Sequence, residues 1–141
     1  MTDPTLQLTV ITQEQELLST TAESVTATTT DGELTILPNH LPLFARLVPS
    51  ELIFRRTNAE NSLVISSGFL EMGSNNQLTV MVDSASQARD LSEEQAQEAI
   101  RQAHQTMTNS NDRSELLRAE AELKRAMLEL KVARKSKKSP L

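Results

Sequence analysis

The sequence contains no cysteine, no tryptophan and no tyrosine, and its three phenylalanines are its only aromatic residues. The absence of cysteine excludes disulfide bonds, thiol catalysis and cysteine-ligated zinc. With so few aromatics, the interior must consist mainly of Leu, Ile, Val and Ala. A chain of 141 residues forms one ordinary domain, or one small domain with an appendage, which excludes a large multidomain enzyme.

Long apolar runs are also missing. No stretch approaches the roughly 20 apolar residues that span a bilayer. The first residues, MTDPTLQLTV, have neither the charged segment nor the apolar segment of a secretory signal. We therefore expect a soluble chain that is made without such a signal.

The sequence lacks the usual catalytic and nucleotide-binding motifs. It has no GxxxxGK[ST], GxGxxG, HExxH or GxSxG segment and no EF-hand loop. His40 and His104 are the only histidines, and they fall in different halves of the chain. We therefore expect no metal site, no cofactor and no catalysis within this chain.

Positive charge is scarce in the first part of the chain and concentrated at its end. Residues 1–90 hold four Arg, no Lys and eleven acidic residues, whereas residues 91–141 hold ten basic and eight acidic residues. From Lys124 onward, seven basic residues face a single Glu. This tail is either a solvated helix face or a docking site for an acidic partner. Nucleic acid is disfavoured because the chain is acidic overall and the tail has no aromatics for base stacking.

The first 86 residues have the pattern of short strands. β-branched residues alternate with polar ones, and turn residues such as Asp31-Gly32 and Gly73-Ser74-Asn75-Asn76 separate the runs. Seven or more such strands favour an antiparallel sandwich or barrel. The predicted strands cover residues 6–12, 23–30, 33–37, 43–48, 51–57, 62–72 and 77–82.

The sequence changes character near Asp90. Asp90 or Ser92 can cap a helix that runs over about 91–107, the polar segment 108–112 breaks it, and a second helix runs over about 113–135. The short connection makes the helices antiparallel. We predict a two-part α+β chain: a β-sandwich docking domain (1–86), then a helical hairpin (87–141) that ends in a disordered basic tail.

The second helix carries a seam that alternates large and small side chains at helical spacing. Because half of these residues are alanine, the seam buries little apolar area. At about 25 cal/mol per Å² of buried apolar area, its contribution to stability is therefore small. We expect a hairpin of marginal stability that can change shape at low cost. Basic residues without bulky apolar neighbours make membrane-surface binding a poor fit. The seam consists of Leu116, Ala119, Leu123, Ala126, Leu130 and Ala133.

The segment from Pro38 to Pro42 has two interpretations. It is either a rigid turn in which His40 makes a local hydrogen bond, or a loop preformed to dock a partner. The apolar run from Leu41 to Phe44 has the pattern of sheet core, which weighs against the docking interpretation.

Four segments in order resemble the epsilon subunit of F-type ATP synthase: GELTILPNHLPLF (32–44), SSGFLEM (66–72), LTVMVDSA (78–85) and AELKRAML (121–128). Their order and spacing match along essentially the full chain. Thr35 and Ser67 stand where many members carry glycine, which alters two local backbone conformations without changing the assignment.

The resemblance implies a non-catalytic subunit of the central stalk, or rotor, that couples proton transport to ATP synthesis. It implies a sandwich of about ten strands docked on the gamma subunit and the c-ring, with rotor contacts at Leu37, Pro38, Asn39 and His40. It also implies an indirect association with the membrane, which we expect at the cytoplasmic face of a bacterial plasma membrane.

The resemblance further implies that the hairpin extends to the alpha/beta catalytic head and inhibits ATP hydrolysis. The basic tail suits an acidic surface there. The expected docking residues are Arg118, Lys124, Arg125, Arg134 and Lys135.

Some members of the family bind ATP in the compact hairpin through an [IL]-D-x-x-R-A motif. Here Ser92 replaces the Asp and Gln95 replaces the Arg, so the charged acceptor and the forked donor are both lost. We expect little or no ATP binding.

Two other classes of function stay open on the residues alone. The chain could be a free-standing adaptor whose basic hairpin binds an unrelated acidic protein. A small-ligand sensor or enzyme would need a pocket with convergent polar groups, for which the sequence offers little.

Overall fold

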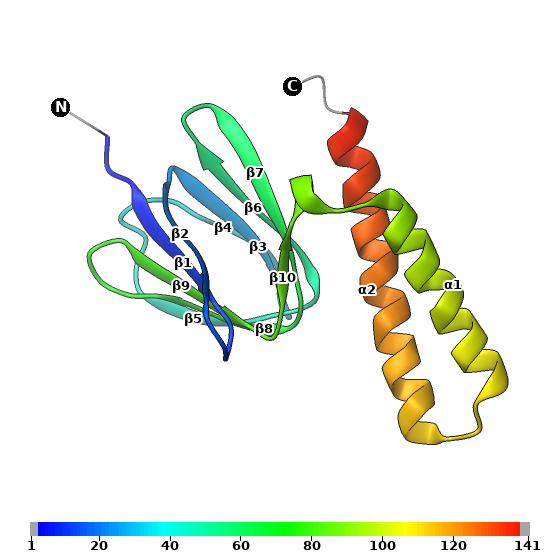
Figure 1. The fold of residues 1–141 in the computed structure, drawn as a ribbon. Helices are drawn as coiled ribbons and strands as arrows, with labels where there is room; N and C mark the ends of the chain where they lie inside the picture. Colours follow the sequence, from blue (N-terminus) through cyan, green and yellow to red (C-terminus); the bar gives the residue numbers. More distant parts are fainter. Residues whose placement is uncertain (1–2, 139–141) are drawn as a thin grey trace. The chain divides into compact units, whose positions relative to one another are not determined.

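The structure, a computed structural model, describes residues 3–138 and divides into two compact units between Ser86 and Gln87. The first unit contains the β-strands and the second the helices (Figure 1).

The described residues of the strand-built part of the chain form ten strands, so the expected sandwich of about ten strands is confirmed. Their bounds are β1 Leu6–Ile11, β2 Glu16–Ala22, β3 Ser24–Thr29, β4 Gly32–Ile36, β5 Leu43–Leu47, β6 Ser50–Arg56, β7 Ala59–Ile65, β8 Gly68–Met72, β9 Gln77–Val82 and β10 Ala85–Gln87.

The strands follow the order β10-β7-β6-β3-β5-β8-β9-β1-β2, and β4 pairs with the free edge of β3 (Figure 1). One edge of β3 is shared: its start pairs with β6, and Thr29 at its end pairs with Leu47 of β5. The sheet therefore folds over at β3 into the two layers of the sandwich. The pairing departs from the predicted antiparallel pattern between β1 and β9, which run parallel.

Buried and partly exposed residues alternate strictly along β1, and the buried ones form the core between the two layers. Leu6, Leu8 and Val10 of β1 are fully buried, and Leu8 and Val10 lie in register with Leu78 and Val80 of β9. Because successive side chains of a strand point to opposite faces, the polar residues between them face outward. The core is aliphatic, as the composition requires, and Phe54 is its one buried phenylalanine.

The sequence interpretation missed two strands and merged two others. The edge strand β2 carries adjacent Leu17 and Leu18, which hides a period of two. The predicted strand 62–72 is two strands, because the chain turns at Ser66 and Ser67. The Ser66 hydroxyl accepts a hydrogen bond from the Ser84 backbone N–H at 2.8 Å and fixes this turn.

The second unit contains a 3₁₀ turn η1 (Ala88–Asp90) and the helices α1 (Glu93–Asn109) and α2 (Arg113–Lys138). Ser92 is the N-cap of α1, and its hydroxyl accepts a hydrogen bond from the backbone N–H of Gln95 at 3.2 Å. The cap moves the start of α1 two residues later than predicted, and the helix also ends two residues later.

The expected disordered tail is wrong for residues 136–138, whose backbone continues α2. The segment KSKK contains no Gly or Pro, and lysine is a good helix former, so nothing in it ends the helix. The rest of the predicted tail, residues 139–141, lies outside the described part of the chain.

Burial confirms the predicted seam. Ala119, Ala126 and Ala133 of α2 are buried, as are Ala96 and Ala103 of α1. The seam leucines 116, 123 and 130 are half-buried. The helices thus approach through small side chains, and each contact removes little apolar surface from water.

Candidate docking surfaces

An aromatic pair lies on the outer surface of the sandwich. The rings of Phe44 (β5) and Phe69 (β8) stack with centroids 5.3 Å apart, and the two residues are 63% and 40% exposed. The Arg46 guanidinium lies 6.0 Å from the centroid of the Phe69 ring, within reach of a cation–π interaction. We call Phe44, Arg46, Phe69 and Met81 the aromatic face.

The prediction that Leu41 to Phe44 belong to the core is wrong for Leu41, Pro42 and Phe44, which are exposed. Leu41 is 78% exposed. In β5, Leu43 packs against the core while Phe44 and Arg46 point outward, as alternation requires. A continuous apolar run does not reveal which phase faces inward, so the sequence alone could not assign Phe44.

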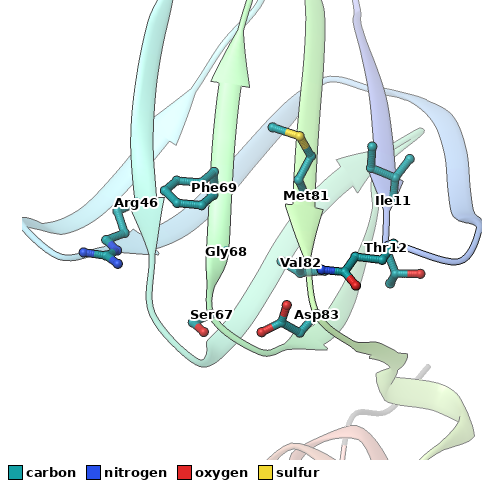
Figure 2. Close-up of a pocket in the computed structure, with 10 residues that line it drawn as sticks. Ile11, Thr12, Arg46, Ser67, Gly68, Phe69, Met81, Val82 and Asp83 are labelled. Carbon is teal, nitrogen blue, oxygen red and sulfur yellow. The ribbon is translucent and has the colours of Figure 1, made fainter.

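A groove of about 410 Å³ borders the aromatic face. Figure 2 shows Arg46 and Phe69 on one side of this groove and Ile11 and Thr12 on the other, with Asp83 near one end. Cross-strand pairing sets its width, because Phe69 lies opposite Arg46 of β5 and Met81 of β9. The lining residues are Ile11, Thr12, Gln13, Arg46, Ser67, Gly68, Phe69, Met81, Val82 and Asp83.

The four predicted rotor-contact residues share one loop, Leu37–Pro42, which we call the proline loop. The His40 backbone N–H donates to the Leu37 carbonyl at 3.2 Å, and Asn39 adopts a left-handed φ of 69° between them. The His40 ring Nδ1 lies 2.7 Å from the Leu41 carbonyl oxygen, so the local hydrogen bond expected for His40 is present.

An asparagine clamp holds the proline loop in place. The Asn39 backbone N–H donates to Oδ1 of Asn76, and Nδ2 of Asn76 donates back to Oδ1 of Asn39 at 3.3 Å. Asn76 itself has a φ of 61° in the turn between β8 and β9. Leu37 is 56% exposed on this clamped loop. Asn76 helps to hold the loop, and the sequence analysis did not identify it.

The predicted basic docking residues do not form one patch. At 100° per residue, Arg118 and Arg125 share one stripe of α2, Lys124 and Lys135 share a second, and Arg134 borders the alanine seam. Ion pairs within the hairpin join Lys124 to Glu120 (3.3 Å), Arg125 to Glu129 (3.1 Å) and Arg134 to Glu93 (2.9 Å).

The residues that replace the nucleotide motif serve the helix itself. Ser92 caps α1, and Gln95 supplies the backbone N–H that it binds. Arg125 contacts Glu129 and also lies 3.9 Å from Glu122 on the same helix. The side chains of Ser92 and Arg125 and the backbone of Gln95 therefore interact within the hairpin.

Among residues 3–138, no group of three or more His, Asp or Glu residues is arranged to hold a metal ion. No helix among residues 3–138 combines the length and the apolar character needed to cross a membrane.

The chain thus joins a strand-built unit, which carries an exposed aromatic pair, to a helical hairpin. Residues 5–88 match the β-sandwich domain of the ATP synthase delta/epsilon chain, and residues 89–134 match its long α-helix domain. The chain belongs to the delta/epsilon chain family of ATP synthase, which confirms the family expected from the sequence.

Similar curated proteins carry the epsilon name. An ATP synthase epsilon chain of Herpetosiphon aurantiacus is 36% identical over 129 residues, which cover 92% of this chain and 94% of the relative. An ATP synthase epsilon chain of Dehalococcoides mccartyi is 38% identical over 136 residues, with 96% of each chain covered.

Two solved structures share the fold. A chain in the mitochondrial ATP synthase of Euglena gracilis, solved with OSCP, F1 and the c-ring, superposes with a TM-score of 0.73 at 20% identity, covering 96% of this chain and 82% of its own length. A chain in the central stalk and c-ring of the Tetrahymena thermophila mitochondrial enzyme gives a TM-score of 0.59 at 16% identity, with coverages of 91% and 96%.

Proposed function

We propose that this chain is the epsilon subunit of an F-type ATP synthase, a non-catalytic part of the central stalk that couples proton transport to ATP synthesis. The observation that carries the proposal is the match of both units, in order, to the two domains of the delta/epsilon chain. Near-complete coverage of the epsilon relatives supports it.

The aromatic face is the proposed docking surface for the gamma subunit. Phe44 and Phe69 are large, exposed and held on adjacent strands, so they present apolar area without first having to become ordered. Arg46 adds a cation beside them. Phenylalanine, methionine and arginine are among the residue types enriched at protein–protein interfaces.

The proline loop is the proposed contact with the c-ring. The clamp between Asn39 and Asn76 fixes the loop, and Leu37 and Leu41 project from it as exposed apolar residues. A rigid loop deforms little when force acts on it, which is what a coupling element in a rotor requires. His40 contributes the local bond to Leu41 that keeps this shape.

The hairpin is proposed to regulate ATP hydrolysis by reaching the alpha/beta catalytic head. Lys124 and Lys135 face away from the seam, so they are oriented toward a partner in the compact hairpin. Arg118 and Arg125 form a second exposed stripe. The association with the membrane is indirect, through the complex, and we propose the cytoplasmic face of a bacterial plasma membrane because both relatives named above are bacterial.

Affinity purification of the tagged chain from membranes tests the proposal. We expect gamma and other synthase subunits to copurify with the wild-type chain, and to be lost with the Phe44→Asp/Phe69→Asp variant. Met127→Asp is the control, since Met127 is an equally exposed apolar residue on the hairpin. Recovery of an unrelated acidic protein without synthase subunits would instead support a free-standing adaptor, a function for which the comparisons give no support.

A further inference from the structure

The two helices of the hairpin are joined by an ion pair at the end opposite their connecting loop. Nε of Arg134, in the last quarter of α2, donates to Oε1 of Glu93, the first residue of α1, at 2.9 Å. The pairs Arg101–Glu98, Lys124–Glu120 and Arg125–Glu129 each lie within one helix. The Glu93–Arg134 pair therefore closes the hairpin, whereas those three stabilise single helices.

The looped end of the hairpin has its own fixed structure. Ser110 donates its hydroxyl to Oε2 of Glu115 at 2.8 Å, and Asp112 accepts the backbone N–H of Ser114 at 3.0 Å. A hairpin tied at its loop separates most easily at the other end. That free end is where Glu93 and Arg134 meet.

Between these two ends the helices meet along the alanine seam. Ala96, Ala103, Ala119 and Ala126 are buried, each with a single methyl group, and Val132 and Ala133 are buried near the free end. The seam leucines are half-buried. A polar contact at the free end adds to this apolar burial and shifts the balance between the closed and open hairpin.

We infer that the Glu93–Arg134 ion pair is a latch that holds the hairpin closed and withholds Arg134 from acidic partners until the hairpin opens. Both side chains keep some exposure, 29% for Glu93 and 51% for Arg134, so an acidic protein surface can compete for the guanidinium. The regulatory part of this inference rests on the proposed function; the closing of the hairpin does not.

Distance measurement between two spin labels tests the latch on the full chain. The sequence has no cysteine, so Gln97→Cys and Met127→Cys provide unique labelling sites, one on each helix and both exposed. Arg134→Gln should lower the ratio of closed to open hairpin about two- to five-fold, the effect expected of a partly exposed ion pair. Amide hydrogen exchange in α1 reports the same ratio when the open fraction is too small for distance measurement.

A double-mutant cycle separates the latch from other effects of Glu93. Glu93 also interacts favourably with the N-terminal dipole of α1, so Glu93→Gln removes more than the ion pair. In the Glu93→Gln/Arg134→Gln variant, the ratio of closed to open hairpin should fall by less than the product of the two single decreases. The difference should be the same two- to five-fold factor. Glu120→Gln, which breaks a pair within α2, is the matched control and should leave the ratio unchanged.

Additive effects in the cycle, or an unchanged ratio in both single variants, would overturn the latch. ATP hydrolysis by the assembled complex then tests its regulatory role. Glu93→Gln frees Arg134 and should increase inhibition, whereas Arg134→Gln also removes a docking residue and should increase it less. A hairpin that opens in Glu93→Gln while hydrolysis stays unchanged would preserve the latch and reject the proposed inhibition.

Discussion

Gly68 shows how a single residue sets the spacing of the strands beneath the aromatic face. A Cβ at this position would lie 2.0 Å from the backbone oxygen of Met81, an atom that cannot move aside without shifting β9. Gly68→Ala should therefore lower the free energy of unfolding by roughly 1–3 kcal/mol. Gly73→Ala is the control, because its Cβ would meet only an ordinary contact at 3.7 Å, and urea denaturation compares the two. Equal stabilities would contradict the role of Gly68.

Glu98 and Arg101 form an exposed pair on α1 with a pH signature. The pKa of Glu98 is lowered from its ordinary value, chiefly by the side-chain hydrogen bond from Arg101. A lowered carboxyl pKa in the folded state means that the pair stabilises the helix above the ordinary glutamate pKa and loses this contribution as the pH falls through the lowered value. Arg101→Gln should raise the pKa of Glu98 toward its ordinary value, as measured by NMR titration of the carboxyl carbon. An unchanged titration would show that Arg101 does not hold the carboxylate in solution.

At the scale of elements, the hairpin is proposed to be dispensable for assembly and necessary for inhibition. A chain that ends before Asp90 keeps the strand-built unit, with its own aliphatic core. We expect complexes with this truncated chain to assemble and to couple proton transport, while ATP hydrolysis rises. The assay compares ATPase rates and proton pumping of membranes that carry either chain. An unchanged hydrolysis rate would reject the inhibitory role of the hairpin.

The hairpin is also expected to lack control by ATP. Ser92 caps α1, and Arg125 is paired with Glu129, so neither residue is arranged as a receptor for phosphate. Titration calorimetry of the full chain should show no saturable heat of ATP binding at micromolar concentrations. Tight binding of one ATP per chain would contradict this prediction and would require a second source of donors, such as rearranged residues of α2.

The elements differ in how far the sequence could predict them. Alternation located most strands, and the candidate caps Asp90 and Ser92 together with the polar break at 108–112 located both helices, because these signals are local. Strand β2 escaped because its adjacent Leu17 and Leu18 hide the period of two. The latch between Glu93 and Arg134 escaped because it depends on the register of two helices, which separates its partners by 41 positions.

The same limit applies to the candidate surfaces. The proline loop could be predicted because Pro38, Asn39 and Pro42 constrain the backbone by their own chemistry. Asn76, which clamps that loop, lies 37 positions away, and nothing in the sequence pairs it with Asn39. Phe44 was assigned to the core because an apolar run does not disclose its inward phase. Long-range partners and outward faces are the features that required the structure.

At the scale of the whole molecule, the two units have separate proposed tasks: the strand-built unit attaches the chain to the rotor and the hairpin regulates hydrolysis. The charges follow the same division, since net negative charge lies in residues 1–90 and net positive charge in residues 91–141. Raised salt should therefore weaken the hairpin's contacts more than the sandwich's, because exposed charges are screened beyond about 10 Å at 0.1 M whereas apolar burial is not.

Site-directed photocrosslinking tests the central claim, that the aromatic face binds the rotor, most directly. A photoreactive phenylalanine analogue at Phe69 places the probe on the exposed stacked ring with little change in size. After illumination of membranes that carry the full chain, the account predicts a crosslink to the gamma subunit, and none when the analogue replaces the buried Phe54. A crosslink from Phe69 to a protein outside the synthase, with gamma left unlabelled, would contradict it.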